Sequence, residues 1–122
     1  MEVRGARLLV LEDDALISID AEDMLLGLGA GAVHLANNVA AATALLASHP
    51  IDLAVLDLRI GHGRSDAFAE ELQARAIPFI IASGYGSDSE LSATLSGVPT
   101  VGKPYTPEAL QEAIALLSGP SH

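Results

Sequence analysis

The segment Leu53-Ala54-Val55-Leu56-Asp57 decides the fold, because four consecutive apolar residues in it end on a carboxylate. A continuous apolar run of this length is typical of a strand buried on both faces of a parallel sheet. Ligands of such sheets bind beyond the carboxyl ends of the strands. We therefore predict that Asp57 lies at the functional edge of a parallel sheet.

Three other apolar runs also end on residues that can bind or react. Residues 8–11 precede Glu12, Asp13 and Asp14, residues 79–82 precede Ser83, and residues 98–102 precede Lys103. Parallel strands end at a shared edge, so these carboxylates, this hydroxyl and this ammonium are expected to meet in one pocket. A pocket of this composition can hold a divalent metal and a phosphoryl group.

Stretches with the apolar spacing of helices separate the strands. A fifth strand is predicted at Ala32–Ala36, and the glycine-containing residues 59–64 are predicted to form a loop. Five strands that alternate with five helices indicate an α/β fold, with a parallel sheet covered by helices on both faces. The helices are predicted after Asp13, after an N-cap at Asn38, over about residues 66–75, over residues 87–95, and from Thr106 and Pro107 onward.

The composition is that of one acidic domain. The 122 residues include 6 basic and 16 acidic side chains, which give a formal net charge of −10, and no cysteine. The charge argues against binding to nucleic acid or anionic membranes, and the lack of cysteine excludes disulfides and thiolate metal sites. No targeting segment or membrane-spanning run is visible. We expect one cytoplasmic domain over residues 1–122, ordered from about residue 6 to residue 118.

The chemistry of the predicted pocket follows from its charges. Three carboxylates crowded at one edge repel one another unless a cation neutralises them, and Mg²⁺ is the usual cation for such oxygen ligands. We predict that Asp13 and Asp57 bind it directly, and Glu12 directly or through water. Asp57 ends the most buried strand and can act as a nucleophile toward phosphorus. Each residue also has an ordinary alternative: Asp13 or Asp14 as a helix N-cap, Ser83 as a turn residue, and Lys103 as a solvated surface charge.

Four short motifs make a family resemblance specific. They are Leu-Glu-Asp-Asp at 11–14, Leu-Asp-Leu at 56–58, Ala-Ser-Gly at 82–84 and Lys-Pro-Tyr at 103–105. Over nearly its whole length the chain resembles the receiver domain of two-component response regulators. The resemblance implies a flavodoxin-like (βα)5 fold, whose five-stranded parallel sheet has the order 2-1-3-4-5.

The resemblance also implies a role for each residue of the pocket. Asp57 would be the phosphoacceptor, Glu12 and Asp13 the acidic pair, Ser83 the switch hydroxyl, and Lys103 the lysine that the family keeps. The backbone carbonyl of Arg59 would complete the Mg²⁺ site, and the Arg59 side chain and Tyr85 would tune access of water. The bond between Lys103 and Pro104 is typically cis in the family.

Two departures from the family pattern carry information. Thr100 stands where receivers usually have an aromatic residue, three positions before the lysine. Residues 81–86 resemble the Phe-Ala-Thr-Gly-hydrophobic-Tyr motif of an atypical subgroup, often stand-alone receivers served by HWE or HisKA2-type histidine kinases, mostly in alphaproteobacteria. We therefore expect phosphorylation to act by moving Ser83 and residues 84–89 toward the phosphoryl group.

Two functions remain open on the sequence. The first is a bacterial receiver that takes phosphate from a histidine kinase onto Asp57 and signals through protein contacts, with no turnover beyond its own phosphorylation and dephosphorylation. Its output, or a dimer contact, would use the face of helix 87–95, strand 99–102 and the last helix. Leu91, Leu95 and Leu110 are the candidates to shape this face, with a core position as the alternative for Leu110. The alternative is a Mg²⁺-dependent phosphatase or phosphotransferase of small molecules. Arg59 disfavours it, because such enzymes carry a second aspartate there.

We do not assign any histidine to the predicted pocket. His34, His49 and His122 are dispersed along the chain and are expected to be structural or exposed. His62 is expected near the pocket, and we do not count it among the metal ligands.

Overall fold

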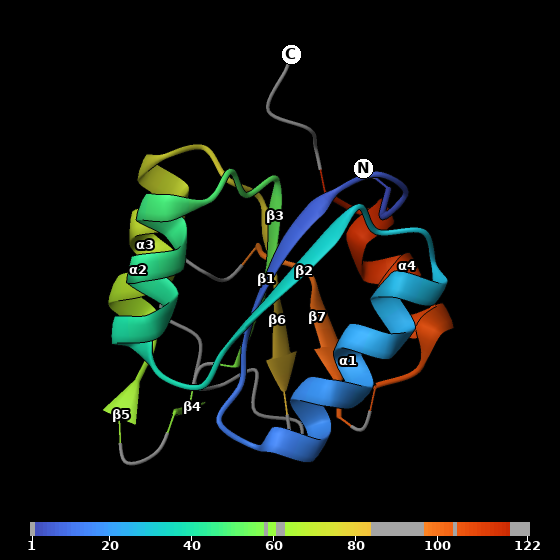
Figure 1. Ribbon diagram of the computed structural model, residues 1–122, viewed down its shortest axis with the longest axis horizontal. Helices are drawn as coiled ribbons and strands as arrows, with labels where there is room; N and C mark the ends of the chain where they lie inside the picture. The colour runs from blue at the N-terminus through green and yellow to red at the C-terminus, as the bar shows by residue number, and fades with distance from the viewer. Residues whose placement is uncertain (1, 58, 61–62, 84–96, 104, 118–122) are drawn as a thin grey trace.

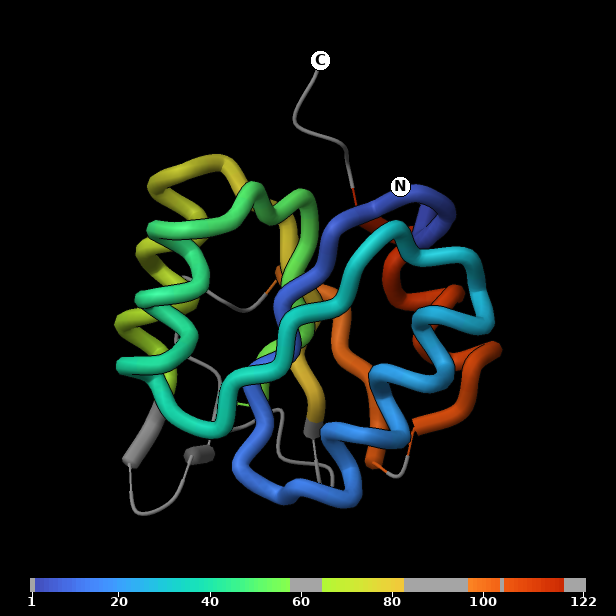
Figure 2. The backbone as a smooth tube through the Cα atoms, in the orientation of Figure 1, coloured from blue at the N-terminus to red at the C-terminus, as the bar shows by residue number. Residues whose placement is uncertain are grey.

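The computed structural model describes residues 2–57, 59–60, 63–83, 97–103 and 105–117. Its five-stranded parallel sheet has the order β2-β1-β3-β6-β7, which confirms the predicted 2-1-3-4-5 arrangement. Figure 2 shows residues 7–11 and 53–57 running side by side through the middle of the molecule. The strands are β1 (Arg7–Leu11), β2 (Ala32–Ala36), β3 (Leu53–Asp57), β6 (Phe79–Ser83) and β7 (Thr100–Gly102).

Helices cover both faces of the sheet. Helices α1 and α4 lie on one face, and α2 and α3 lie on the other (Figure 1). Four predicted helices are present among the described residues, and the predicted helix over residues 87–95 lies outside them. The helices are α1 (Ala15–Gly27), α2 (Val39–Ser48), α3 (Asp66–Ala74) and α4 (Pro107–Ala115).

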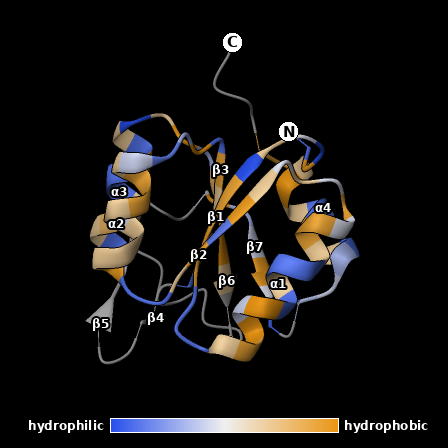
Figure 3. Cartoon of the chain, in the orientation of Figure 1, coloured by the Kyte–Doolittle hydropathy of each residue, from blue (hydrophilic) through white to orange (hydrophobic). Residues whose placement is uncertain are grey.

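The core consists of two apolar layers, one on each side of the sheet. Side chains alternate along a strand, so Leu8 and Val10 pack toward α1 and α4, whereas Leu9 and Leu11 pack toward α2 and α3. Every residue of β3 is buried, as its continuous apolar run predicted. Figure 3 shows the same concentration of hydrophobic residues along the central strands.

Helix starts agree with the capping residues in the sequence. The Asn38 side chain accepts a hydrogen bond from the backbone N–H of Ala41, and Thr106 accepts one from Ala109. Pro107 occupies the first turn of α4, where its missing N–H costs nothing. Local sequence therefore fixes where α2 and α4 begin.

Helix α3 ends in a Schellman motif whose left-handed residue is alanine. The N–H of Ile77 donates to the carbonyl of Leu72, and the N–H of Ala76 donates to that of Gln73. Ala76 has a φ of 57°, a region where glycine is the usual residue. The fold therefore holds Ala76 in a conformation that its side chain disfavours.

Two predictions about local structure need correction. Residues 59–64 were expected to be a loop, but β4 (Arg59–Ile60) pairs antiparallel with β5 (Gly63–Arg64). Only two residues separate Ile60 from Gly63, which is the spacing of a tight hairpin. The last strand was expected from residue 99 but starts at Thr100. Among the described residues, no helix is long and apolar enough to cross a membrane.

Candidate functional site

Glu12 and Asp57 lie next to each other because of the register between two central strands. Strand β1 pairs with β3 so that Leu11 lies opposite Leu56, and the carboxylates of Glu12 and Asp57 follow at the strand ends. Ligand oxygens of Glu12, Asp13 and Asp57 all lie within 4.8 Å of one another. The predicted convergence of these three carboxylates is therefore present in the structure.

Lys103 binds two of these carboxylates at once. Its Nζ donates a hydrogen bond of 2.7 Å to Asp57 Oδ2 and one of 3.0 Å to Glu12 Oε1. The Lys103 side chain is only 17 % exposed, and that of Glu12 is fully buried. Lys103 is therefore a member of the site, and the alternative of a solvated surface charge is wrong.

Burial dominates the electrostatics of Glu12. Loss of water raises the pKa of Glu12, and the negative charge of Asp57 raises it further. The Asp14 backbone N–H, which donates to Glu12 Oε2 at 3.0 Å, and the Lys103 ammonium lower this pKa only in part. The free site therefore disfavours the charged form of Glu12.

For Lys103, the combined effect of the carboxylate partners on the pKa is larger than the effect of burial. Burial by itself lowers the pKa of Lys103, but the hydrogen bonds to Asp57 and Glu12 outweigh it, so that its pKa is raised overall. The ammonium consequently stays charged at neutral pH and provides a fixed positive group between the two carboxylates.

Asp13 and Asp14 have separate tasks. The Asp14 carboxylate caps α1 by accepting hydrogen bonds from the backbone N–H groups of Leu16 at 2.9 Å and Ile17 at 3.1 Å. Asp13 is exposed and belongs to the carboxylate cluster. The N-cap alternative is thus correct for Asp14, which leaves Asp13 for the cluster.

The donor set fits a hard divalent cation. Among the described residues, three carboxylates gather within a few ångströms, and the Lys103 ammonium contacts two of them. Carboxylate oxygens are the ligands that Mg²⁺ prefers, and an exposed member such as Asp13 gives the ion access from solvent. Glu12, Asp13 and Asp57 are therefore the residues that could hold the ion.

A buried serine, which the sequence analysis did not single out, supports Asp57. Ser65 is 1 % exposed, and its Oγ donates a hydrogen bond of 2.7 Å to the backbone carbonyl of Asp57. Its place just before α3 reads as an N-cap, yet its side chain makes no cap hydrogen bond. Ser65 instead ties the carboxyl end of β3 to the start of the following helix.

Tyr105 has a buried hydroxyl beside the carboxylates. This hydroxyl has no hydrogen-bond partner in the described part of the chain, and the residue is 5 % exposed. Burial raises the pKa of Tyr105, and the charges of Glu12 and Asp57 raise it further, so the phenol keeps its proton. The hydroxyl is therefore a buried donor that no described residue accepts from.

The backbone places Ser83 at the same edge. In the pairing of β3 with β6, Asp57 lies opposite Ala82, so Ser83 is the next residue beyond it. Arg59 begins the β4–β5 hairpin, two residues after Asp57. Of the two interpretations of Leu110, the core position is correct and the output face is not, because this residue is fully buried. The other predicted positions, residues 84–89, Leu91, Leu95, Pro104, His62 and His122, lie outside the described residues.

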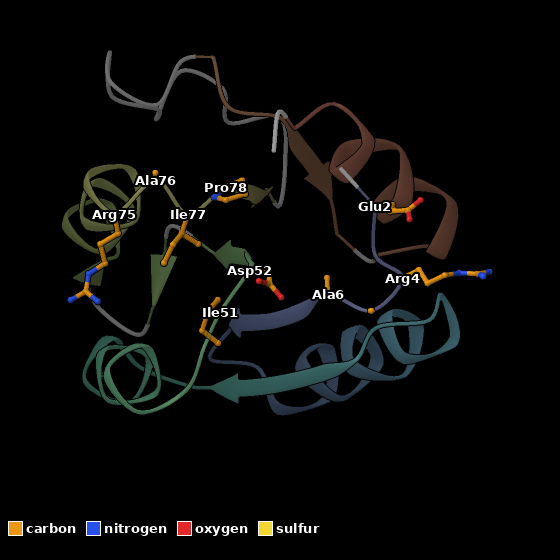
Figure 4. A pocket seen from close by; sticks show the side chains of 10 residues that line it. Glu2, Arg4, Ala6, Ile51, Asp52, Arg75, Ala76, Ile77 and Pro78 are labelled. Atoms are coloured by element: carbon orange, nitrogen blue, oxygen red, sulfur yellow. The ribbon is translucent and has the colours of Figure 1, made fainter. Parts of the chain in front are cut away.

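A separate hollow lies at the opposite, amino-terminal edge of the sheet. It has a volume of about 540 Å³, and its lining includes Ala6, Ile51, Asp52, Ile77 and Pro78. Figure 4 shows the side chains of Arg4 and Arg75 at its border, pointing away from it. The carboxylate site and this hollow are therefore distinct features.

Comparison with solved structures gives matches over more than nine tenths of the chain. The solution structure of SdrG from Sphingomonas melonis Fr1 is 34 % identical, with 94 % of this chain and 97 % of that chain covered and a TM-score of 0.75. The BeF3-activated conformation of SdrG, from Pseudomonas melonis Fr1, is also 34 % identical, with 92 % and 95 % covered and a TM-score of 0.77.

A more distant match has the same fold. The response regulator receiver domain protein from Clostridium thermocellum is 20 % identical, with 90 % of this chain and 91 % of that chain covered and a TM-score of 0.78. No protein-family model matches the sequence, and no curated protein matches it.

Proposed function

Because the chain belongs to the response regulator receiver domains, we propose that Asp57 accepts a phosphoryl group from a histidine kinase. The observation that carries the proposal is the contact of one ammonium with two buried carboxylates at the ends of parallel strands. Receiver domains are signalling components of two-component systems, and the proposal assigns the reacting atoms to this chain.

In the proposed reaction, an Asp57 carboxylate oxygen attacks phosphorus. The new bond joins this oxygen to phosphorus, the bond from phosphorus to the histidine nitrogen breaks, and the nitrogen keeps the electron pair. Lys103 then balances negative charge on the phosphoryl oxygens, because its Nζ already lies 2.7 Å from Asp57 Oδ2. Ser65 holds the backbone of the nucleophile in place through its bond to the Asp57 carbonyl.

The acidic pair would hold Mg²⁺ against the phosphoryl group. Glu12, Asp13 and Asp57 are the side-chain ligands that we assign, with the Arg59 backbone carbonyl as a further one. When bound, Mg²⁺ neutralises charge on the carboxylates and on the transferred oxygens. Ser83 is assigned as the hydroxyl that donates to the phosphoryl group, with its motion and that of residues 84–89 carrying the signal.

The phosphodonor protein is proposed to approach over the first turns of α1. Leu16 is 76 % exposed and Ile19 is 49 % exposed, and this helix starts three residues after Glu12. Two exposed apolar side chains that close to the site suit a protein partner, because a small phosphate ester gains nothing from them. We assign this partner as a histidine kinase, and the HWE or HisKA2 type suits the motif at residues 81–86.

The test combines a small phosphodonor with matched variants. With acetyl phosphate and Mg²⁺, wild-type protein should gain the mass of one phosphoryl group in an acid-labile linkage. The Asp57→Asn variant should gain none, whereas Asp23→Asn, which removes an exposed carboxylate from α1, should behave as wild type. Labelling of Asp57→Asn to the wild-type extent would refute the assignment. Sustained release of phosphate from small esters would favour a phosphatase instead.

A further inference from the structure

Two histidines that look dispersed in the sequence are in contact in the fold. His34 lies on β2, the edge strand of the sheet, and His49 is the C-cap residue of α2. Their ring centroids are 4.4 Å apart, and the ring planes are tilted by 43°. The pair was expected to be separate structural or exposed residues, so its contact needs its own interpretation.

Regular backbone hydrogen bonds hold both residues. His34 pairs with Leu9 in the parallel ladder, and Leu9 faces the layer of α2 and α3. The backbone N–H of His49 donates to the Leu45 carbonyl at 2.9 Å, which anchors it to the last turn of α2. His34 is half-buried and His49 is exposed, so the pair is fixed at the backbone and open to solvent.

A neighbouring serine fixes the tautomer of His49. The single hydroxyl proton of Ser48 is donated to the Ala44 carbonyl at 2.8 Å. With that proton on the bond to Ala44, the serine oxygen accepts in the 2.9 Å contact with His49 Nδ1, and the ring proton lies on Nδ1. Nε2 then has a free lone pair. A histidine whose other ring nitrogen donates to a fixed oxygen is the usual arrangement of a metal ligand.

We propose that His34 and His49 form a binding site for a late first-row divalent metal ion, Cu²⁺ or Ni²⁺. A metal–nitrogen bond of about 2.1 Å places a ring centre roughly 3.2 Å from the ion. If one nitrogen of each ring binds the same ion, ring centres 4.4 Å apart subtend an angle of about 90° at that ion. This angle belongs to adjacent positions of square-planar or octahedral geometry, whereas tetrahedral Zn²⁺ needs ring centres about 5.2 Å apart.

No basic side chain of β2 or α2 opposes a cation at this edge. Neither β2 nor α2 contains a lysine or arginine that would repel a metal ion, and the whole chain has a net charge of −10. Water completes the coordination on the solvent side, where His49 is exposed. The site shares no residue with the Glu12–Asp13–Asp57 cluster, so the two can be loaded separately.

Metal titration of the whole chain tests the inference. CuCl₂, NiCl₂ and ZnCl₂ are titrated by calorimetry at pH 7.5 with excess MgCl₂, which occupies the carboxylate cluster. Histidine ring signals are followed by NMR with NiCl₂. We expect one Ni²⁺ per chain, perturbation of both rings, and tighter binding of Cu²⁺ than of Zn²⁺. His34→Gln and His49→Gln should each weaken Ni²⁺ binding about tenfold or more.

The other two histidines provide the control. His62→Gln and His122→Gln should leave Ni²⁺ affinity unchanged, and circular dichroism should show that all four variants keep the fold. Unchanged Ni²⁺ affinity in folded His34→Gln and His49→Gln would overturn the proposal, as would perturbation of only one of the two rings.

Discussion

Lys103 Nζ lies 2.7 Å from Asp57 Oδ2, although 46 residues separate the two in the chain. The same nitrogen reaches Glu12, 91 residues away, at 3.0 Å. One side chain at the end of β7 therefore joins the ends of β1 and β3, which lie in the middle of the sheet.

Replacing Lys103 by methionine should separate metal binding from phosphoryl acceptance. Removal of the ammonium leaves two buried carboxylates without their cation, and should lower the free energy of unfolding by about 1–3 kcal/mol without Mg²⁺. Mg²⁺ should bind at least as tightly as in wild type, because a competing positive charge is gone. Labelling by acetyl phosphate should fall strongly. Urea unfolding and calorimetry check the first two effects, and weaker Mg²⁺ binding would contradict the charge argument.

Glu12→Gln should stabilise the metal-free protein at neutral pH. Burial raises the pKa of Glu12, so the folded state binds this proton more tightly than the unfolded state does. The contribution of Glu12 to stability is therefore complete below its unfolded pKa, near pH 4, and is lost as pH rises through its folded pKa. Glu12→Gln should therefore be more stable than wild type at pH values above the folded pKa of Glu12. Below the unfolded pKa of Glu12, the two proteins should be equally stable. Urea unfolding with EDTA at pH 4 and pH 7.5 measures both limits.

Mg²⁺ should stabilise the wild-type protein. An ion that binds only the folded state adds about 2.7 kcal/mol at a concentration of one hundred times Kd, a rise in Tm on the order of 10 °C. Asp13→Asn should reduce this rise without removing the cap of α1, which Asp14 provides. Thermal melts with MgCl₂ at matched ionic strength check the effect, with NaCl as control. An equal rise in Asp13→Asn would exclude Asp13 as a ligand.

Tyr105→Phe should raise stability by about 1 kcal/mol, because it removes a buried donor that has no acceptor among the described residues. Phenylalanine keeps the ring that packs in the core. Tyr105→Leu serves as a control, since it also loses ring contacts and should destabilise. A clear loss of stability in Tyr105→Phe would mean that the hydroxyl has a partner in solution, such as a bound water.

Ala76→Gly should also stabilise the fold, by up to about 1 kcal/mol, because glycine adopts the left-handed conformation without strain. The matched control is Ala74→Gly, two residues earlier at the end of α3, where glycine should cost about 0.5–1 kcal/mol. Chemical denaturation of the pair gives the comparison, and destabilisation by both substitutions would contradict the strain argument.

Sequence pattern was sufficient for the sheet and for the carboxylate cluster. Glu12, Asp57 and Lys103 each follow an apolar strand directly, and parallel strands bring such positions to one edge. The order of the strands came from the family resemblance. Periodicity alone does not distinguish one parallel order from another.

Contacts that depend on tertiary packing could not be predicted from the sequence. Ser65 donates to a backbone carbonyl eight residues away, and no sequence pattern predicts this hydrogen bond. The contact of His34 with His49 exists only because α2 packs across the edge strand. The β4–β5 hairpin was missed because two-residue strands carry no detectable alternation.

The distance in sequence between Lys103 and its partners has a consequence for how the protein is made. Synthesis produces Glu12 and Asp57 early, and the balancing ammonium leaves the ribosome only with the last strand. Long loops must close before these groups meet, which is a slow step of folding. A growing chain therefore carries Glu12 and Asp57 without the lysine that contacts them, and brings the three side chains together only when β7 docks against β6.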